Sequence, residues 1–166
     1  LCGAIFLIFA RPKPLTLAIG AAVSILGLLL RAWASGHIRK NDELATSGPY
    51  AFSRNPLYLG SFLLGLGFTI GAGWWPLWIL FVAVFLGIYF PVMRVESRTL
   101  AGLFGEKFQG YSANVPLFFP RPTPYRDPDN RSTFDQRLYM RYREYQAAIG
   151  LVAAWGVLIF KAYYWK

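Results

Sequence analysis

Four stretches of the chain contain no Asp, Glu, Lys or Arg and consist mostly of apolar residues. They are residues 1–10, 15–30, 55–93 and 145–160. A membrane-spanning helix needs about 20 apolar residues, with a range of roughly 17–25. The second stretch reaches that length if its helix continues past Arg31 to Ala34, because the long Arg31 side chain can extend to the membrane surface. The pattern therefore predicts helices that cross a membrane.

The third stretch is too long for a single span, since it runs for 39 residues. Its middle, residues 71–76, reads Gly-Ala-Gly-Trp-Trp-Pro, and Gly and Pro favour a turn while Trp suits the membrane interface. We expect a helical hairpin with helices at 56–71 and 75–93. A last helix is expected at about 145–164, and residues 1–10 resemble the second half of a further helix. The fold class is an all-α integral membrane protein with about five spans, the first incomplete.

Composition and charge agree with a membrane protein. Apolar residues make up 55% and charged residues 15%, against about 45–50% and about 25% in soluble domains. This excludes a disordered chain and disfavours a soluble one. A single Cys excludes an internal disulfide, and no Cys/His cluster suggests a metal site.

The basic residues predict an orientation in the membrane. Segments 31–55 and 94–145 hold thirteen of the 17 Lys and Arg residues, and the opposite side holds four. Cytoplasmic loops carry this excess, so both segments are expected in the cytoplasm. The net charge of +9 then reflects topology and contact with membrane lipids, and no nucleic-acid partner is expected.

Three regions follow along the chain. Residues 1–120 form a membrane body, 121–144 a Pro-rich and charged cytoplasmic connector, and 145–166 a C-terminal transmembrane helix. Within the body, apolar residues at helical spacing after Arg94 predict an amphipathic helix on the cytoplasmic face. They are Leu100, Leu103, Phe104, Phe108 and Tyr111.

Polar residues that suit ligand binding occur at two places on the predicted cytoplasmic side. Pro56 is typical of a first helical residue, which places Arg54 and Asn55 at the positive end of a helix, a good anion site. The alternative for Arg54 is contact with lipid phosphate. Glu96 follows the second hairpin helix, where it either pairs with Arg94, Arg98 or Arg54 or binds a cationic group of a ligand.

Glycines in the first hairpin helix have two interpretations. Gly67-x-x-x-Gly71 is a small-residue motif for helix packing, and Gly20, Ser24 and Gly27 on the preceding span suit the same role. In the alternative, Gly65-Leu66-Gly67 lets a cofactor lie against bare backbone.

Several motifs together resemble a known family. They are Gly48-Pro49-Tyr50, Arg54-Asn55-Pro56-Leu57-Tyr58, Glu96 with Leu100, Phe104-Gly105, Tyr111, Val115-Pro116 and Pro120. In this order, over about residues 30–120, they resemble the integral-membrane methyltransferases, which include isoprenylcysteine carboxyl methyltransferases and phosphatidylethanolamine N-methyltransferases. The sequence departs from the family pattern where Asn55 replaces a His and Ser97 replaces a second Glu.

The resemblance implies S-adenosylmethionine as the cofactor. Carried over by position, Arg54 and Glu96 would be catalytic and would also bind the cofactor. The other implied cofactor-binding residues are Asn55, Pro56, Tyr58, Gly65 and Gly67. The charges fit, since Arg54 suits the cofactor carboxylate and Glu96 its ammonium, and an aromatic face such as Tyr58 or Phe62 suits the sulfonium.

The expected activity is methyl transfer from S-adenosylmethionine to a lipophilic acceptor that enters from the bilayer. An isoprenylcysteine-type carboxylate is favoured because it is already ionised, whereas an ammonium must first lose a proton. The single histidine, His37, is interpreted as an ordinary interfacial residue. The alternatives are a phospholipid amine N-methyltransferase, a sterol-reductase-like enzyme that uses NADPH, and a non-enzymatic membrane scaffold.

Overall fold

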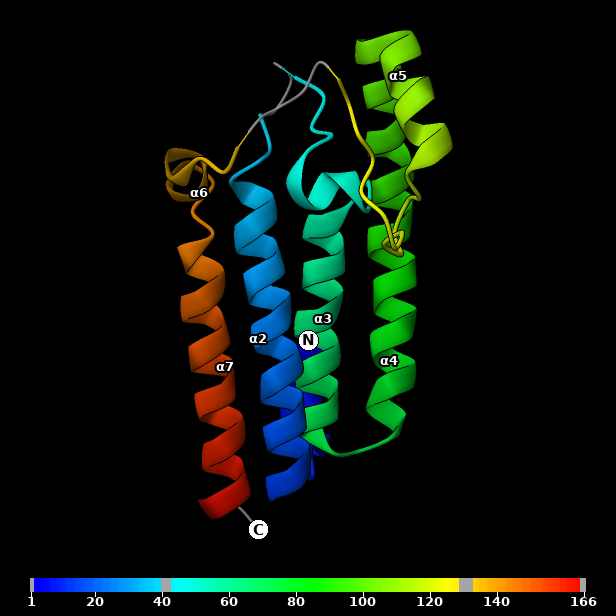
Figure 1. The fold of residues 1–166 in the computed structure, drawn as a ribbon. Coiled ribbons are helices and arrows are strands. Elements are labelled where there is room, and N and C mark those ends of the chain that lie inside the picture. Colours follow the sequence, from blue (N-terminus) through cyan, green and yellow to red (C-terminus); the bar gives the residue numbers. More distant parts are fainter. Residues whose placement is uncertain (1, 40–42, 129–132, 165–166) are drawn as a thin grey trace.

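The computed structural model describes residues 2–39, 43–128 and 133–164, and within these ranges the chain is helical with no β-strand. The long helices stand side by side with nearly parallel axes (Figure 1). The elements in chain order are α1 (Cys2–Phe9), α2 (Pro14–Ser35), the 3₁₀ turn η1 (Gly48–Ala51), α3 (Pro56–Ala72), α4 (Pro76–Val84), the π-helical turn η2 (Phe85–Tyr89), α5 (Phe90–Asn114), α6 (Gln136–Arg141) and α7 (Tyr145–Tyr164).

Three of these helical segments are long and apolar enough to cross a membrane. They are α2, the continuous helix from Pro76 to Asn114, and α7, and the apolar α3 is slightly shorter at 17 residues. The prediction of an all-α membrane protein is therefore confirmed, as are the helix at 145–164 and the hairpin.

Small residues bring α2 and α3 into close contact along their length. A Cβ atom built on Gly67 would overlap the Gly20 carbonyl and the Ser24 hydroxyl, and a Cβ on Gly27 would lie 2.7 Å from the Gly60 carbonyl oxygen. Ser24 is fully buried, and its hydroxyl donates to the Leu64 carbonyl at 3.4 Å. The packing role predicted for these glycines is confirmed.

The hairpin turn forms where Gly and Pro predicted it. Gly73 ends α3 in the left-handed region, with φ of 66°, and its N–H donates to the Ile70 carbonyl at 3.0 Å. Pro76 then begins α4, where its missing N–H costs no helical hydrogen bond. Because only glycine adopts positive φ without strain, Gly73 suits this turn.

The second hairpin helix does not end at Met93 but continues to Asn114. It is interrupted at Gly105, whose φ of 50° and ψ of −123° reverse the chain direction. After this reversal Phe108 and Tyr111 are buried against Leu44 and Val115. Leu100 and Phe104 pack against the same cluster, whereas Leu103 is 55% exposed.

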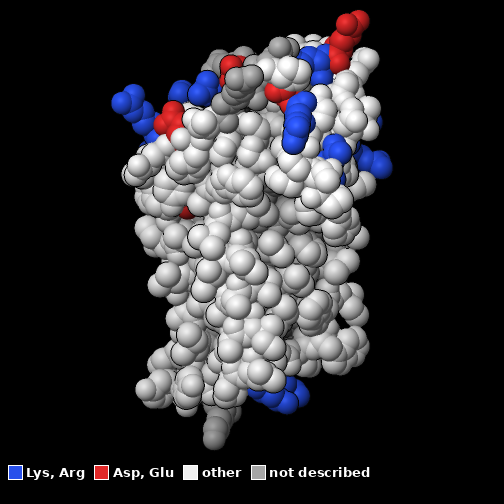
Figure 2. Space-filling model, viewed as in Figure 1, with Lys and Arg blue, Asp and Glu red and all other residues white. Residues whose placement is uncertain are grey.

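Charged side chains gather at one end of the helix bundle, as Figure 2 shows, and a smaller basic group lies at the other end. We call the first end the loop end, because the described parts of residues 36–55 and 115–144 lie there (Figure 1). The membrane-crossing part of the surface between the two ends is almost free of charge. This distribution matches a protein whose middle lies in lipid.

Candidate active site

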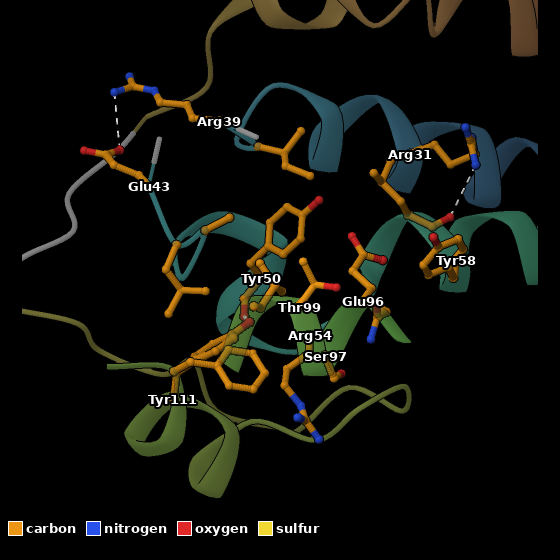
Figure 3. Close-up of a pocket in the computed structure, with 17 residues that line it drawn as sticks. Arg31, Arg39, Glu43, Tyr50, Arg54, Tyr58, Glu96, Ser97, Thr99 and Tyr111 are labelled. Carbon is orange, nitrogen blue, oxygen red and sulfur yellow. Dashed lines mark hydrogen bonds and ion pairs between the residues drawn. The ribbon is translucent and has the colours of Figure 1, made fainter. Parts of the chain in front are cut away.

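A cavity of about 350 Å³ opens at the loop end, which is within the usual size range for small-molecule sites. Its walls come from α2, from the loop before η1, from η1 and the loop after it, and from α3 and α5 (Figure 3). The polar residues that line it are Arg31, Arg39, Glu43, Tyr50, Arg54, Asn55, Tyr58, Glu96, Ser97, Thr99 and Tyr111. The sequence therefore placed Arg54, Asn55, Tyr58 and Glu96 together correctly, on one cavity.

The loop that carries Arg54 is held by hydrogen bonds to the segment after α5. The Arg54 backbone N–H donates to the Pro116 carbonyl at 3.0 Å, and the Ser53 hydroxyl donates to the Phe118 carbonyl at 2.8 Å. The buried Asn55 side-chain amide donates to the Leu117 carbonyl at 2.9 Å. The side-chain N–H of Asn55 therefore stabilises the loop. Asn55 stands at the position where the family pattern has a His.

Arg54 keeps donors available for a ligand. Its Nε is buried without a hydrogen-bond partner among the described residues. Burial lowers the pKa of Arg54, an effect that the nearby Tyr111 partly offsets, but a guanidinium starts so far above neutral pH that it stays charged. A buried N–H without a partner is costly, so this group suits an anionic ligand.

Glu96 extends from α5 into the same cavity, close to Tyr50 and Tyr58 (Figure 3). Among the described residues, no Lys or Arg lies within ion-pair distance of its carboxylate. Arg94, one of the three predicted partners, instead lies 4.5 Å above the Phe90 ring. The interpretation of Glu96 as half of an ion pair with Arg94, Arg98 or Arg54 is therefore wrong in this structure, and its charge is available to a cation.

Tyr50 is a site residue that sequence reasoning missed, although it belongs to the Gly48-Pro49-Tyr50 motif. Its hydroxyl is buried and has no hydrogen-bond partner in the described part of the chain, while its carbonyl accepts a 2.7 Å hydrogen bond from the Tyr111 hydroxyl. Burial, and then the Glu96 charge, raise the pKa of Tyr50 well above its usual range. Tyr50 therefore stays a neutral phenol and offers the cavity one hydrogen-bond donor.

Three residues of the predicted cofactor-binding set, Gly65, Gly67 and Pro56, lie outside the lining of the cavity. Gly65 faces the Phe81 ring of α4, and Gly67 faces α2. Pro56 is buried as the first residue of α3. The physical reason is depth: Gly65 and Gly67 lie two to three turns, or roughly 14–17 Å, along α3 from Pro56, inside the packed bundle.

Phe62 and His37 also lie outside the lining of the cavity. Phe62 packs in an aromatic cluster with Phe81, Phe85 and Phe118. The buried His37 ring places Nδ1 2.9 Å from the Trp33 carbonyl oxygen, which agrees with an ordinary structural role. Within the described parts of the chain, no group of His, Cys, Asp and Glu residues could hold a metal ion.

Comparison with known proteins identifies the family. The phospholipid methyltransferase family matches residues 15–107, which is more than half of the chain. This range includes α2, α3 and α4, together with Arg54, Tyr58 and Glu96 on the cavity wall.

Three curated proteins illustrate the range of relatives. The cobalt-zinc-cadmium resistance protein CzcN of Cupriavidus metallidurans is 37% identical over 116 residues, which cover 69% of this chain and 53% of that protein. The nickel-cobalt-cadmium resistance protein NccN of Alcaligenes xylosoxydans xylosoxydans is 34% identical over 117 residues, covering 63% and 51%. The protein-S-isoprenylcysteine O-methyltransferase of Schizosaccharomyces pombe is 31% identical over 81 residues, covering 49% and 34%.

The chain spans about half the length of the first two of these relatives. No solved structure matches it. The matched family, the apolar helices and the similarity to an isoprenylcysteine methyltransferase agree with one another. The chain therefore belongs to the phospholipid methyltransferase family of integral-membrane methyltransferases.

Proposed function

We propose that the protein transfers a methyl group from S-adenosylmethionine to a lipophilic acceptor, and that the favoured acceptor is an isoprenylcysteine-type carboxylate. The observation that carries this proposal is the pair of available opposite charges on one cavity. Glu96 has no cationic partner among the described residues, and Arg54 has a buried Nε without an acceptor. A zwitterionic ligand satisfies both.

The residues present fit the amino-acid part of S-adenosylmethionine. Glu96 would hold its ammonium and Arg54 its carboxylate, each by a charge-assisted hydrogen bond. The aromatic ring of Tyr58 on the cavity wall suits the sulfonium. When bound, this cofactor supplies an electrophilic methyl group on sulfur. The role of the chain is then to align the acceptor with that methyl group and to exclude water.

The polar groups of the cavity favour an acceptor that is already ionised. Tyr50 is held as a neutral phenol, and the single histidine points to a backbone carbonyl outside the cavity. Neither is suited to remove a proton from an ammonium at neutral pH. A carboxylate needs no such step: it would accept the methyl group that the cofactor supplies and become a methyl ester, with the neutral thioether as the leaving group.

A phospholipid amine is the second candidate acceptor, because the matched family is the phospholipid methyltransferase family. For either acceptor, the excess of Lys and Arg at the loop end supports a cytoplasmic cavity. The alternative of a non-enzymatic scaffold is disfavoured by a cavity of ligand size lined with charged residues.

The direct test uses purified protein in detergent or lipid nanodiscs. We expect it to bind radiolabelled S-adenosylmethionine and not NADPH, and to label a farnesylated cysteine in preference to phosphatidylethanolamine. Mass spectrometry should identify a base-labile methyl ester. Binding of NADPH alone would favour the reductase alternative, and labelling of the amine alone would make the phospholipid the acceptor.

A separate prediction concerns Arg54. Arg54→Ala should weaken S-adenosylmethionine binding by about 1.5–3 kcal/mol, or roughly 10- to 150-fold in Kd, because a charge-assisted hydrogen bond is lost. Isothermal titration or equilibrium dialysis measures this change. Arg94→Ala is the matched control, because Arg94 is an exposed arginine that lies outside the cavity lining. Equal Kd values for the two variants would remove Arg54 from the site.

A further inference from the structure

An ion pair connects the C-terminal helix to the wall of the cavity. The Arg31 guanidinium donates to both carboxylate oxygens of Glu144, from Nε at 3.0 Å and from Nη2 at 2.9 Å. Its third nitrogen, Nη1, donates to the Ser61 hydroxyl at 2.5 Å. The side chains are only 22% and 11% exposed, so solvent screens this pair weakly. Arg31 is therefore held in one orientation by three contacts, one on α3 and two on Glu144, the residue just before α7.

The chain adopts an uncommon backbone conformation to place Glu144 there. Arg143, the residue before it, has φ of 54°, and no other described residue besides glycine has a positive φ. A β-carbon makes this conformation unfavourable, so it persists where surrounding contacts require it. Glu144 also lies outside residues 15–107, the part that the family matches. The pair is thus an addition to the family-matched part of this chain.

Arg31 shares one side of the cavity with Glu96. Figure 3 shows Arg31, Tyr58 and Glu96 together on this side, and all three line the cavity. An arginine side chain is long and flexible, and a guanidinium without a partner is attracted to a nearby carboxylate in a weakly screened environment. Without Glu144, Arg31 would be attracted to Glu96, the carboxylate on this cavity wall that has no cationic partner among the described residues.

We propose that Glu144 is a positioning residue that keeps Arg31 away from Glu96 and so keeps the Glu96 carboxylate available to the cationic group of the ligand. This inference rests on the proposed function, in which Glu96 holds the ammonium of S-adenosylmethionine. It gives the C-terminal segment a role in cofactor affinity, although that segment contributes no residue to the cavity lining.

The test is a double-mutant cycle read out as the Kd for S-adenosylmethionine. Glu144→Gln should raise Kd about tenfold or more, since the released Arg31 competes for Glu96. Arg31→Gln should raise Kd less than Glu144→Gln does, because no guanidinium then competes for Glu96. The double variant Arg31→Gln/Glu144→Gln should return Kd to the value of Arg31→Gln. This asymmetry is not expected from a purely structural ion pair, for which both single variants are equally harmful.

A separate control tests whether each variant still folds. Melting curves without ligand report the stability of each variant, and the double variant leaves no unpaired charge if a single variant unfolds. Asp135→Asn is the matched control, because it removes a carboxylate from the same connector outside the cavity. An unchanged Kd for Glu144→Gln, or a double variant as weak as that single variant, would overturn the inference. Wild-type protein that binds no S-adenosylmethionine would overturn the proposed function and this role with it.

Discussion

Glu96→Gln is expected to reduce the affinity for S-adenosylmethionine by at least about 2 kcal/mol, or roughly 30-fold in Kd. The substitution keeps the shape of the side chain and removes the charge that would neutralise the ligand ammonium. The loss is large because Glu96 has no other cationic partner among the described residues and lies on a partly enclosed cavity. Direct binding, and the rise in melting temperature that ligand causes, both measure it.

Glu106→Gln is the matched control for this experiment. Glu106 lies on the same helix, α5, but is exposed and outside the cavity lining. The Glu106→Gln protein should bind S-adenosylmethionine with the same Kd as the wild type. If Glu96→Gln and Glu106→Gln have the same Kd and the same methyl-transfer rate, the ammonium is held elsewhere and the assignment of Glu96 fails.

Gly67→Leu should have the largest effect on stability. A Cβ atom at this position would already overlap the Gly20 carbonyl and the Ser24 hydroxyl, which belong to the backbone and a buried side chain of α2. The two helices must separate, which loses van der Waals contact along their whole interface. Overpacking costs about 1–3 kcal/mol or more, so we expect the melting temperature without ligand to fall on the order of 10 °C.

Two other glycine variants test whether the loss of stability is specific to Gly67. A Cβ on Gly156 of α7 meets no atom within 4 Å, so Gly156→Leu should melt close to wild type. A Cβ on Gly65 would meet the Phe81 ring, which can move. The melting temperature of Gly65→Leu should therefore lie between those of the other two variants. A Gly65→Leu protein that is stable without ligand but is no longer stabilised by S-adenosylmethionine would show that the cofactor touches Gly65. Similar melting of Gly67→Leu and Gly156→Leu would contradict the α2–α3 packing.

The long-range features of the fold were predictable from charge-free stretches and turn residues. Pro56, Gly73 and Pro76 mark the ends of helices in the sequence because their backbone preferences are local. The reversal at Gly105 was not predictable, since a single glycine in a helical pattern does not reveal its φ. A helix after Arg94 was predicted, but its continuity with the second hairpin helix was not, because the apolar run ends at Met93 and the helix does not.

The site was predictable only in part. The sequence predicted Arg54 and Glu96 as site residues because a charge beside an apolar span costs free energy, so its presence there indicates a function. Tyr50 was missed because the feature that singles it out is a buried hydroxyl with no partner among the residues that the structure describes, and only the packing reveals this. The pair Arg31–Glu144 joins residues 113 positions apart, and no local spacing indicates such a contact. Gly65 and Gly67 were assigned to the cofactor by motif, although depth in the bundle places them in helix packing.

The hydrogen bonds between the Arg54 loop and the segment after α5 have a consequence for the order of assembly. The carbonyls of Ala51 and Phe52 accept from the backbone N–H groups of Tyr125 and Arg121, and the Arg54 N–H donates to Pro116. A nascent chain that ends at residue 107, where the family match ends, has none of these partners. The loop that presents Arg54 therefore acquires these backbone partners only after the ribosome has added the residues through Tyr125, so the cavity wall is completed after α2 and α3 have already been made.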